Sequence, residues 1–186
     1  MTRKTALLII DAQTGIIEGP TDGPVYNAEG LLGTMQAVLS QARQQAIPVW
    51  YVQDLDVAEP GDKAFDTHPA IAPLPGEPII HKRATDSFHG TDLHDQLQAA
   101  GIGHLVIMGC QTQFCIDSAC RKATTLGYDV TLVKDGHSTT DNPVLSAEQI
   151  IAHHNKLLHG LSNLEPFILV RHSEENLFEP THDSYR

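Results

Sequence analysis

Near its middle the chain reads His104-Leu105-Val106-Ile107-Met108-Gly109-Cys110-Gln111-Thr112-Gln113-Phe114-Cys115, and this stretch decides the expected fold. A short apolar run over 104–108, without polar alternation, is typical of a strand that is buried on both faces. After a short polar loop, Cys115–Leu126 has a helical pattern that ends at Gly127. This order of strand, loop and helix places Cys115 where a buried strand has ended and a helix begins.

That position makes Cys115 a candidate nucleophile. Backbone N–H groups and the positive end of the helix dipole favour thiolate over thiol there, and the same N–H groups can bind an oxyanion. The competing interpretation is a small buried hydrophobe, which is the commoner role of a cysteine. Position alone favours the second interpretation, so a catalytic role requires partners from elsewhere in the chain.

Apolar runs alternate with amphipathic stretches along the rest of the chain. Strands are expected at Ala6–Ile10, Val49–Gln53, Pro78–His81, His104–Met108, Asp129–Val133 and Pro166–Val170. Helices are expected at Ala28–Ala46, from Thr91 or Asp92 to Ala100, at Cys115–Leu126 and, with Ser146 as N-cap, at Ser146–His159. The region from Asp54 to Glu77 contains four prolines and is expected to be a functional or mobile loop.

This alternation predicts an α/β fold. We expect a three-layer α/β/α sandwich around a mostly parallel, doubly wound sheet of six strands, because strands separated by helices pair in parallel and are covered on both faces. Residues 1–173 are expected to form a single domain. The polar tail 174–186 is expected to be loose or to lie on a partner subunit.

Composition excludes several classes of protein. The chain has 186 residues, of which 41% are hydrophobic and 19% charged, as in ordinary globular domains. Its net charge of −11 argues against a nucleic-acid-binding or anionic-membrane surface. Only five apolar residues precede Asp11, too few for the core of a secretory signal. With three cysteines, an odd number, we expect a cytoplasmic protein with free thiols.

Two further residues are candidate partners of Cys115. In doubly wound sheets, sites lie beyond the carboxyl ends of the strands, and the commonest order places strand one beside strand four. Asp11 follows strand one directly, so it is expected near Cys115 as a general base. Lys82 follows the third strand, where a cation stabilises a thiolate and a carboxylate. The competing interpretations are a turn-capping aspartate and a solvated lysine. His137, after the fifth strand, is an alternative base in a Cys–His dyad.

Three segments resemble the isochorismatase-like cysteine hydrolases, the superfamily of nicotinamidase and N-carbamoylsarcosine amidase. Leu7-Leu8-Ile9-Ile10-Asp11-Ala12-Gln13 is similar to the opening strand and catalytic aspartate of that family. Lys82, followed by Ser87-Phe88-His89-Gly90-Thr91-Asp92-Leu93, resembles the lysine segment. Gly109-Cys110-Gln111-Thr112-Gln113-Phe114-Cys115-Ile116 resembles the nucleophile loop, with Leu126-Gly127-Tyr128-Asp129-Val130 as the strand after it. The resemblance covers about residues 6 to 170.

By this resemblance the catalytic triad is Asp11, Lys82 and Cys115. It also implies a cis peptide bond between Cys110 and Gln111, and an oxyanion hole made by the N–H groups of Gln111 and Cys115. The implied activity is hydrolysis of an amide, carbamoyl or lactam C–N bond of a small molecule through a thioester. Family members that hydrolyse the ether of isochorismate lack the cysteine, which argues against that activity. The alternatives are a non-catalytic or redox-sensing relative with a reactive Cys115 and, less favoured, an ether hydrolase of the isochorismatase type.

No metal and no organic cofactor is expected. Nicotinamidases of the family carry Asp-x-His after the second strand, whereas this chain has Gln53-Asp54-Leu55-Asp56. A cation site made by Asp54, Asp56 and His68 is an alternative to a polar loop edge, which we favour.

The sequence also gives expectations for the substrate pocket and the subunits. The pocket is expected to include Gln13, Phe88 and Gln113, which flank the triad in sequence. The family pattern favours a homo-oligomer, a dimer or tetramer, that acts on a small molecule. The adjacent His153 and His154 project in different directions on a helix, so they are poor co-ligands.

Overall fold

The fold comes from a computed structural model that describes residues 3–19, 24–163 and 165–186. Its strands are β1 (Lys4–Ile10), β2 (Val49–Asp54), β3 (Ile79–Lys82), β4 (Ile102–Cys110), β5 (Asp129–Ser138) and β6 (Ile168–Arg171). Its α-helices are α1 (Thr14–Ile17), α2 (Ala28–Gln44), α3 (Leu93–Ala99), α4 (Asp117–Thr125) and α5 (Ala147–Leu158). Shorter helical turns cover Pro69–Ile71, Thr112–Ile116 and Thr181–Tyr185. Within the described ranges, no helix is long and apolar enough to cross a membrane.

The six strands form one sheet in the order β3-β2-β1-β4-β5-β6. All five strand pairings are parallel, so the predicted six-stranded, doubly wound sheet is confirmed. Strand order reverses between β1 and β4, which lie side by side in the centre. The carboxyl ends of these two strands therefore meet at the switch point, where ligands bind in such folds.

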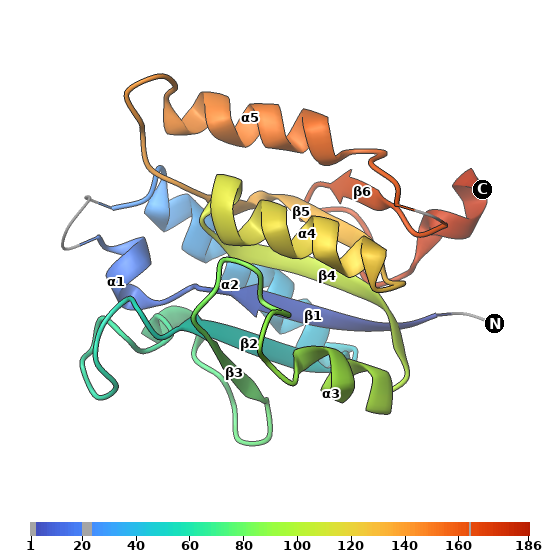
Figure 1. The fold of residues 1–186 in the computed structure, drawn as a ribbon, viewed down its shortest axis with the longest axis horizontal. Coiled ribbons are helices and arrows are strands. Elements are labelled where there is room, and N and C mark those ends of the chain that lie inside the picture. The colour runs from blue at the N-terminus through green and yellow to red at the C-terminus, as the bar shows by residue number, and fades with distance from the viewer. Residues whose placement is uncertain (1–2, 20–23, 164) are drawn as a thin grey trace.

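Helices cover both faces of the sheet, which gives the predicted three layers (Figure 1). On one face, Leu8 and Ile10 of β1 pack with buried residues of α3, α4 and α5. On the other face, Leu7 and Ile9 pack with α2. Every residue of β1 from Thr5 to Ile10 is buried, which explains why this strand reads as a continuous apolar run and not as an alternating one.

The predicted start of α5 is confirmed. The Ser146 side chain accepts a hydrogen bond from the backbone N–H of Gln149, and the Gln149 side chain accepts one from the N–H of Ser146. This reciprocal arrangement is a capping box, which satisfies N–H groups that the first helical turn leaves free.

Gly109 allows β1 and β4 to approach closely at the switch point. It has φ +139°, and a Cβ atom there would lie 1.9 Å from the carbonyl oxygen of Ile10. The register of β4 against β5 also shifts between Ile107 and Gly109. Just beyond Ile10, Asp11 has a left-handed φ of 49°, and its N–H donates to the carbonyl of Val52. The left-handed conformation of Asp11 redirects the chain where β1 ends.

The long loop between β2 and β3 is fastened to the segment after β1. The Gln13 amide accepts a hydrogen bond from the N–H of Asp54 at 2.8 Å and donates to the carbonyls of Asp54 and Phe65 at 3.1 and 2.8 Å. The backbone of Thr14 also donates to the carbonyl of Asp66. The loop expected to be functional or mobile is therefore held by specific hydrogen bonds near its start and middle.

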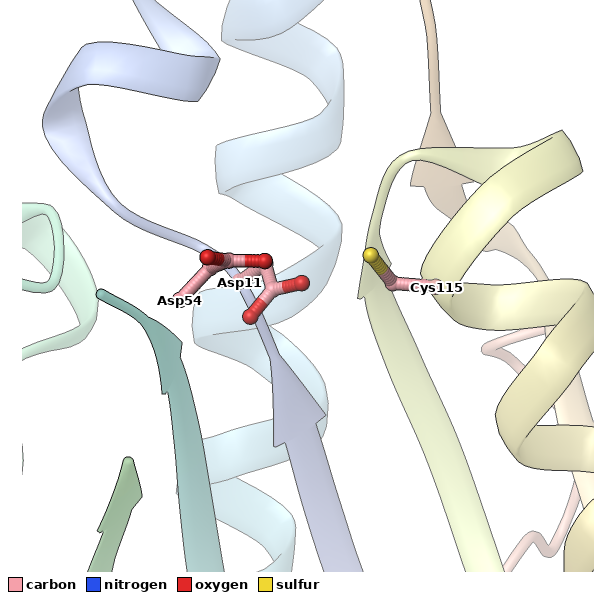
Figure 2. Close-up of side chains that lie close together, drawn as sticks. All are labelled: Asp11, Asp54 and Cys115. Atoms are coloured by element: carbon pink, nitrogen blue, oxygen red, sulfur yellow. The ribbon is translucent and has the colours of Figure 1, made fainter. Parts of the chain in front are cut away.

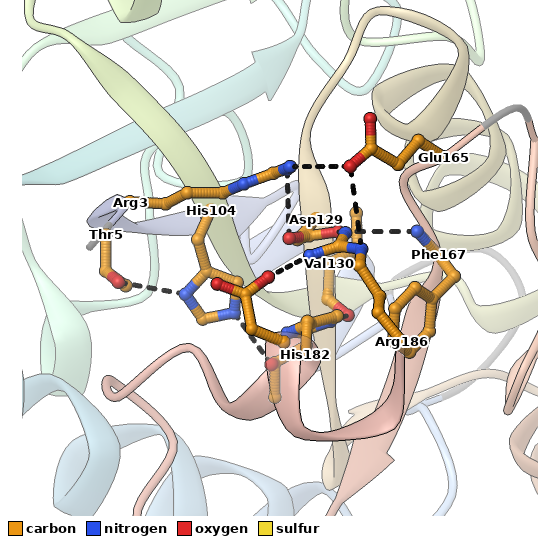
Figure 3. A network of polar contacts seen from close by, with 11 residues as sticks. Arg3, Thr5, His104, Asp129, Val130, Glu165, Phe167, His182 and Arg186 are labelled. Carbon is orange, nitrogen blue, oxygen red and sulfur yellow. Dashed lines mark hydrogen bonds and ion pairs between the residues drawn. The ribbon is translucent and has the colours of Figure 1, made fainter. Parts of the chain in front are cut away.

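The C-terminal segment packs on its own domain and is not loose. The alternative expectation, that it lies on a partner subunit, stays a prediction. Leu177 and Phe178 are buried with the α2 face of the core. Arg186 pairs with Asp129, a carboxylate that is 1% exposed and also pairs with Arg3 at 2.9 Å. Arg3 and Arg186 thus meet at Asp129, the first residue of β5 (Figure 3).

Beside this ion pair lies a buried histidine pair. The His104 ring hydrogen-bonds the hydroxyls of Thr5 and Thr131 at 2.9 and 2.8 Å. His182, from the last helical turn, donates to the carbonyl of Val130 and packs on the His104 ring (Figure 3). Burial lowers the pKa of His104 to about 3. This cluster lies at the amino end of the sheet, away from the switch point, and we interpret it as structural.

The close approach at Gly109 predicts the effect of adding one methyl group. Gly109→Ala should lower the free energy of unfolding by more than about 2 kcal/mol, because the Ile10 carbonyl and the positive φ both oppose a side chain. Gly33→Ala is the control, since a Cβ there meets nothing within 4 Å. It should raise stability by about 0.5–1 kcal/mol. Urea unfolding of both variants measures these free energies. Equal free energies of unfolding for Gly109→Ala and Gly33→Ala would contradict the close approach of β1 and β4.

Candidate active site

The carboxyl edge of the sheet brings four side chains together. Asp11 follows β1, while Asp54 and Lys82 are the last residues of β2 and β3. Cys115 lies in the helical turn that follows β4. Figure 2 shows the sulfur of Cys115 facing the carboxylates of Asp11 and Asp54 across the end of β1. The one sulfur and two carboxylates place ligand atoms within 4.8 Å of one another. The structure thus places Asp11, Lys82 and Cys115 side by side.

The ammonium group of Lys82 is at the centre of this cluster. Its Nζ lies 2.8 Å from Asp11 Oδ2 and 2.6 Å from Asp54 Oδ2. It also donates to the sulfur of Cys115 at 3.4 Å. The Lys82 side chain is 0% exposed and that of Asp11 1%, so this pair is removed from water. A buried charge is tolerated only when it is paired and hydrogen-bonded. Here the carboxylates of Asp11 and Asp54 both form ion pairs with the ammonium group of Lys82.

Burial sets the proton affinities in the cluster. Burial raises the pKa of Asp11 to about 6, and the nearby Lys82 ammonium opposes that rise. Burial and the Asp11 carboxylate raise the pKa of Cys115 to about 12, against the effect of Lys82. At neutral pH a thiol therefore lies beside an ionised carboxylate. This differs from the expectation that the helix end favours a thiolate, because desolvation and a like charge outweigh the helix dipole.

The turn that carries Cys115 is not the start of an ordinary α-helix. Residues Thr112–Ile116 form a π-helical turn, and α4 begins only at Asp117. The N–H groups of Phe114 and Ile116 both donate to the carbonyl of Gln111. The peptide bond between Cys110 and Gln111 is cis, as the family resemblance implied. The predicted oxyanion hole at the N–H groups of Gln111 and Cys115 remains a prediction.

The position of Lys82 bears on whether the nearby acidic groups can bind a metal ion. Asp11, Asp54 and Cys115 are metal-ligand types, but the ammonium already occupies the space between them. The residues of the alternative cation site have separate partners: Asp54 pairs with Lys82, Asp56 pairs with Arg83 at 3.0 Å, and His68 lies 3.3 Å from Glu18. The absence of a metal stays a prediction.

His137 is not placed as the base of a Cys–His dyad. Its Nδ1 is hydrogen-bonded to the hydroxyl of Thr112 at 2.9 Å, and its Nε2 to the amide of Asn155 at 3.0 Å. Both ring nitrogens therefore have partners other than Cys115. Among the candidate bases, Asp11 is the one that shares the buried cluster with the sulfur.

Two of the three expected pocket residues have structural roles instead. Gln13 is fully buried and its amide holds the loop after β2. Phe88 lies in the core, stacked on Tyr128 with a centroid distance of 6.2 Å. Neither lines the cavity of about 470 Å³ beside Lys82, which is lined by Leu55, His81, Lys82, Arg83, Ala84, His89 and Gly90. Gln113 is partly buried, and Phe114 beside Cys115 is 52% exposed.

Sequence reasoning missed the role of Asp54 as the second partner of Lys82. The signal was present, because Asp54 follows the expected strand Val49–Gln53 as Asp11 follows the expected strand Ala6–Ile10. His153 and His154, whose roles the sequence left open, pack edge to face on α5 with a centroid distance of 5.5 Å. His154 also bonds the carbonyl of Ile150 in its own helix.

Comparison with known proteins identifies relatives with this arrangement of elements. The family model described as "Isochorismatase domain" matches residues 5–148. The uncharacterized isochorismatase family protein YddQ of Bacillus subtilis (strain 168) is 31% identical over 156 residues, 78% of this chain and 86% of that protein. A streptothricin hydrolase of Streptomyces noursei is 31% identical over 142 residues, 74% of this chain. This match spans only 51% of the length of the streptothricin hydrolase.

A solved structure gives the same result for the fold. The crystal structure of an isochorismatase family protein has a TM-score of 0.83 to this chain at 31% identity. The match covers 92% of this chain and 99% of that one.

The charges around the sulfur predict how readily it is alkylated. In Asp11→Asn the apparent pKa of Cys115, read from the pH dependence of iodoacetamide alkylation, should fall by about 1 or more, because a negative neighbour is removed while Lys82 stays. Cys110 and Cys120 are fully buried and should stay unlabelled. Asp56→Asn, at an exposed carboxylate, is the control and should leave the pKa unchanged. An unchanged pKa in Asp11→Asn would show that the carboxylate does not act on the thiol.

Proposed function

The chain belongs to the isochorismatase family of hydrolases, and from that premise we propose that it is a cysteine hydrolase that cleaves a C–N bond of a small amide, carbamoyl or lactam compound. The observation that carries this proposal is the buried cluster in which Lys82 contacts both Asp11 and the sulfur of Cys115. A nucleophile, a base within reach of it and a cation that orients both are the parts that covalent acyl transfer requires.

The first half of the proposed reaction forms a thioester. Asp11 takes the proton of the Cys115 thiol as the sulfur attacks the carbonyl carbon, and a C–S bond forms. The N–H groups of Gln111 and Cys115 donate hydrogen bonds to the carbonyl oxygen and stabilise the negative charge that develops on it. Asp11 then gives its proton to the nitrogen, the C–N bond breaks and the amine leaves. Lys82 stabilises the negative charge on carboxylate and sulfur throughout.

The second half returns the enzyme to its starting state. Water attacks the thioester carbon and gives a proton to Asp11, the C–S bond breaks, and the proton returns to the sulfur. One carboxylate thus serves as base and acid in turn, which requires a pKa not far from the working pH. The pKa of Asp11, raised by burial to about 6, satisfies that requirement.

The leaving atom is the reason for proposing a C–N bond. An amine leaves readily only when its nitrogen is protonated, and in this proposal the protonated Asp11 delivers that proton. The relative named streptothricin hydrolase makes streptothricin one compound to include among the substrates tested. We also expect a reducing compartment such as the cytoplasm, since the reaction needs a free thiol and all three cysteines are free.

Substitution of the nucleophile and base tests the proposal. Cys115→Ala and Asp11→Asn should each lower kcat/KM for amine release by about 10³-fold or more, because one removes the bond-forming atom and the other the proton acceptor. Ammonia and amine release from a panel of small amides, carbamoyl compounds and lactams is the measurement. Cys120→Ala and Asp56→Asn are matched controls outside the cluster. Turnover that survives in Cys115→Ala would refute the proposal.

The acid limb of the pH profile reports the ionisation of Asp11. Because the carboxylate must be unprotonated to take the thiol proton, kcat/KM should fall about tenfold per pH unit below about pH 6. The Asp54 carboxylate contributes to the raised pKa of Asp11, so Asp54→Asn should move this limb to lower pH. A profile that stays flat down to pH 4 would exclude Asp11 as the base.

A further inference from the structure

A chain of hydrogen bonds, buried at Thr112 and His137 and partly exposed at Asn155, joins the nucleophile turn to helix α5, and the proposed reaction does not use it. It runs from the hydroxyl of Thr112 to His137 Nδ1 at 2.9 Å, and from His137 Nε2 to Asn155 Oδ1 at 3.0 Å. It ends where Asn155 Nδ2 donates to the carbonyl of Lys134 at 3.0 Å. Thr112 and His137 are 0% and 2% exposed.

The last bond fixes the direction of all the others. Because the backbone carbonyl of Lys134 is an acceptor only, the Asn155 atom that faces it is the NH2 group. The Asn155 oxygen therefore faces His137, and Nε2 of His137 must carry a hydrogen to donate to it. Nδ1 is then the acceptor, and the hydroxyl of Thr112 donates to it. These hydrogen bonds together select one tautomer of His137 and one orientation of the Thr112 hydroxyl.

His137, the histidine in this series of hydrogen bonds, stays neutral at physiological pH. Burial lowers the pKa of His137 to about 4, although its bond to Asn155 opposes that change. A neutral ring with a fixed tautomer is a rigid connector, because it donates on one side and accepts on the other.

Thr112 is the point at which this connector reaches the site. It is the first residue of the π-helical turn Thr112–Ile116 that carries Cys115, and its carbonyl accepts the N–H of Asp117, where α4 begins. The turn also packs directly against α5. Fixing Thr112 therefore fixes the first residue of the turn that carries the sulfur of Cys115.

We propose that Thr112, His137 and Asn155 are positioning residues that hold the nucleophile turn in register with the Lys82–Asp11 pair. This inference rests on the proposed function, since positioning matters only if Cys115 attacks a substrate. Without these hydrogen bonds the Cys115 thiol is still present, but its position relative to Lys82 and Asp11 is no longer fixed. A displacement of about 1 Å at a reacting group lowers the rate by about 100-fold.

A pair of substitutions at Thr112 separates positioning from packing. Thr112→Ser keeps the hydroxyl that donates to His137, whereas Thr112→Val keeps the shape and removes the donor. In Thr112→Val, kcat should fall about 10–100-fold with KM nearly unchanged, while Thr112→Ser should stay within about threefold of the parent protein. His153→Gln is the control, an exposed neighbour on α5 outside the chain of bonds.

Two readouts do not depend on turnover. The rate of iodoacetamide alkylation of Cys115 should change in Thr112→Val and not in Thr112→Ser. Nitrogen-15 NMR of the unsubstituted protein should show His137 neutral with its hydrogen on Nε2 between pH 6 and 8, and Asn155→Ala should lose that fixed tautomer. If no amide is turned over, the proposed function fails, yet these readouts still decide whether the connector exists.

Each result of these experiments either supports or overturns the inference. Slower kcat and altered alkylation in Thr112→Val alone, with an Nε2–H tautomer, support the inference. Equal kinetics and equal alkylation in Thr112→Val and Thr112→Ser overturn it. If Thr112→Val does not fold, the tautomer of His137 in the unsubstituted protein decides whether the inference holds. A hydrogen on Nδ1 of His137 would contradict the donor and acceptor directions described above and overturn the inference.

Discussion

The site depends on one buried cation. The ammonium of Lys82 lies 2.8 Å from Asp11, 2.6 Å from Asp54 and 3.4 Å from the sulfur of Cys115, with its side chain closed to solvent. Without it, two carboxylates and a sulfur would face one another in a region of low dielectric constant, where like charges repel strongly. With it, the carboxylate of Asp11 stays ionised near neutral pH beside a protonated thiol. The same contact therefore stabilises the arrangement and, in the proposed reaction, keeps Asp11 ionised to take the thiol proton.

The parallel sheet brings these groups to one place. Asp11, Asp54 and Lys82 come from the carboxyl ends of β1, β2 and β3, and Cys115 follows β4. In a parallel sheet these ends share one edge, so residues far apart in sequence meet without a long connection. The fold thus supplies the position of each group, and the local turns supply its direction.

Much of this architecture could be predicted, because buried parallel strands give continuous apolar runs and a polar residue that ends such a run marks the functional edge. Asp11 followed this rule. The π-helical turn at Thr112 could not be predicted, since one extra residue in a turn leaves the helical pattern of the following residues almost unchanged. The packing of the C-terminal segment was also missed. It depends on Leu177 and Phe178, two apolar residues in a polar stretch, and on the pairing of Arg186 with a carboxylate 57 residues away.

The central claim is that Cys115 becomes covalently acylated while Asp11 handles the proton. Rapid acid quenching during turnover of the best amide substrate, followed by mass spectrometry of the digested protein, tests it most directly. The account predicts that the peptide containing Cys115 gains the mass of the acyl group, the substrate without its amine, as a burst of amine is released. An amine burst with Cys115 unmodified, or an acyl group on another residue, would contradict it.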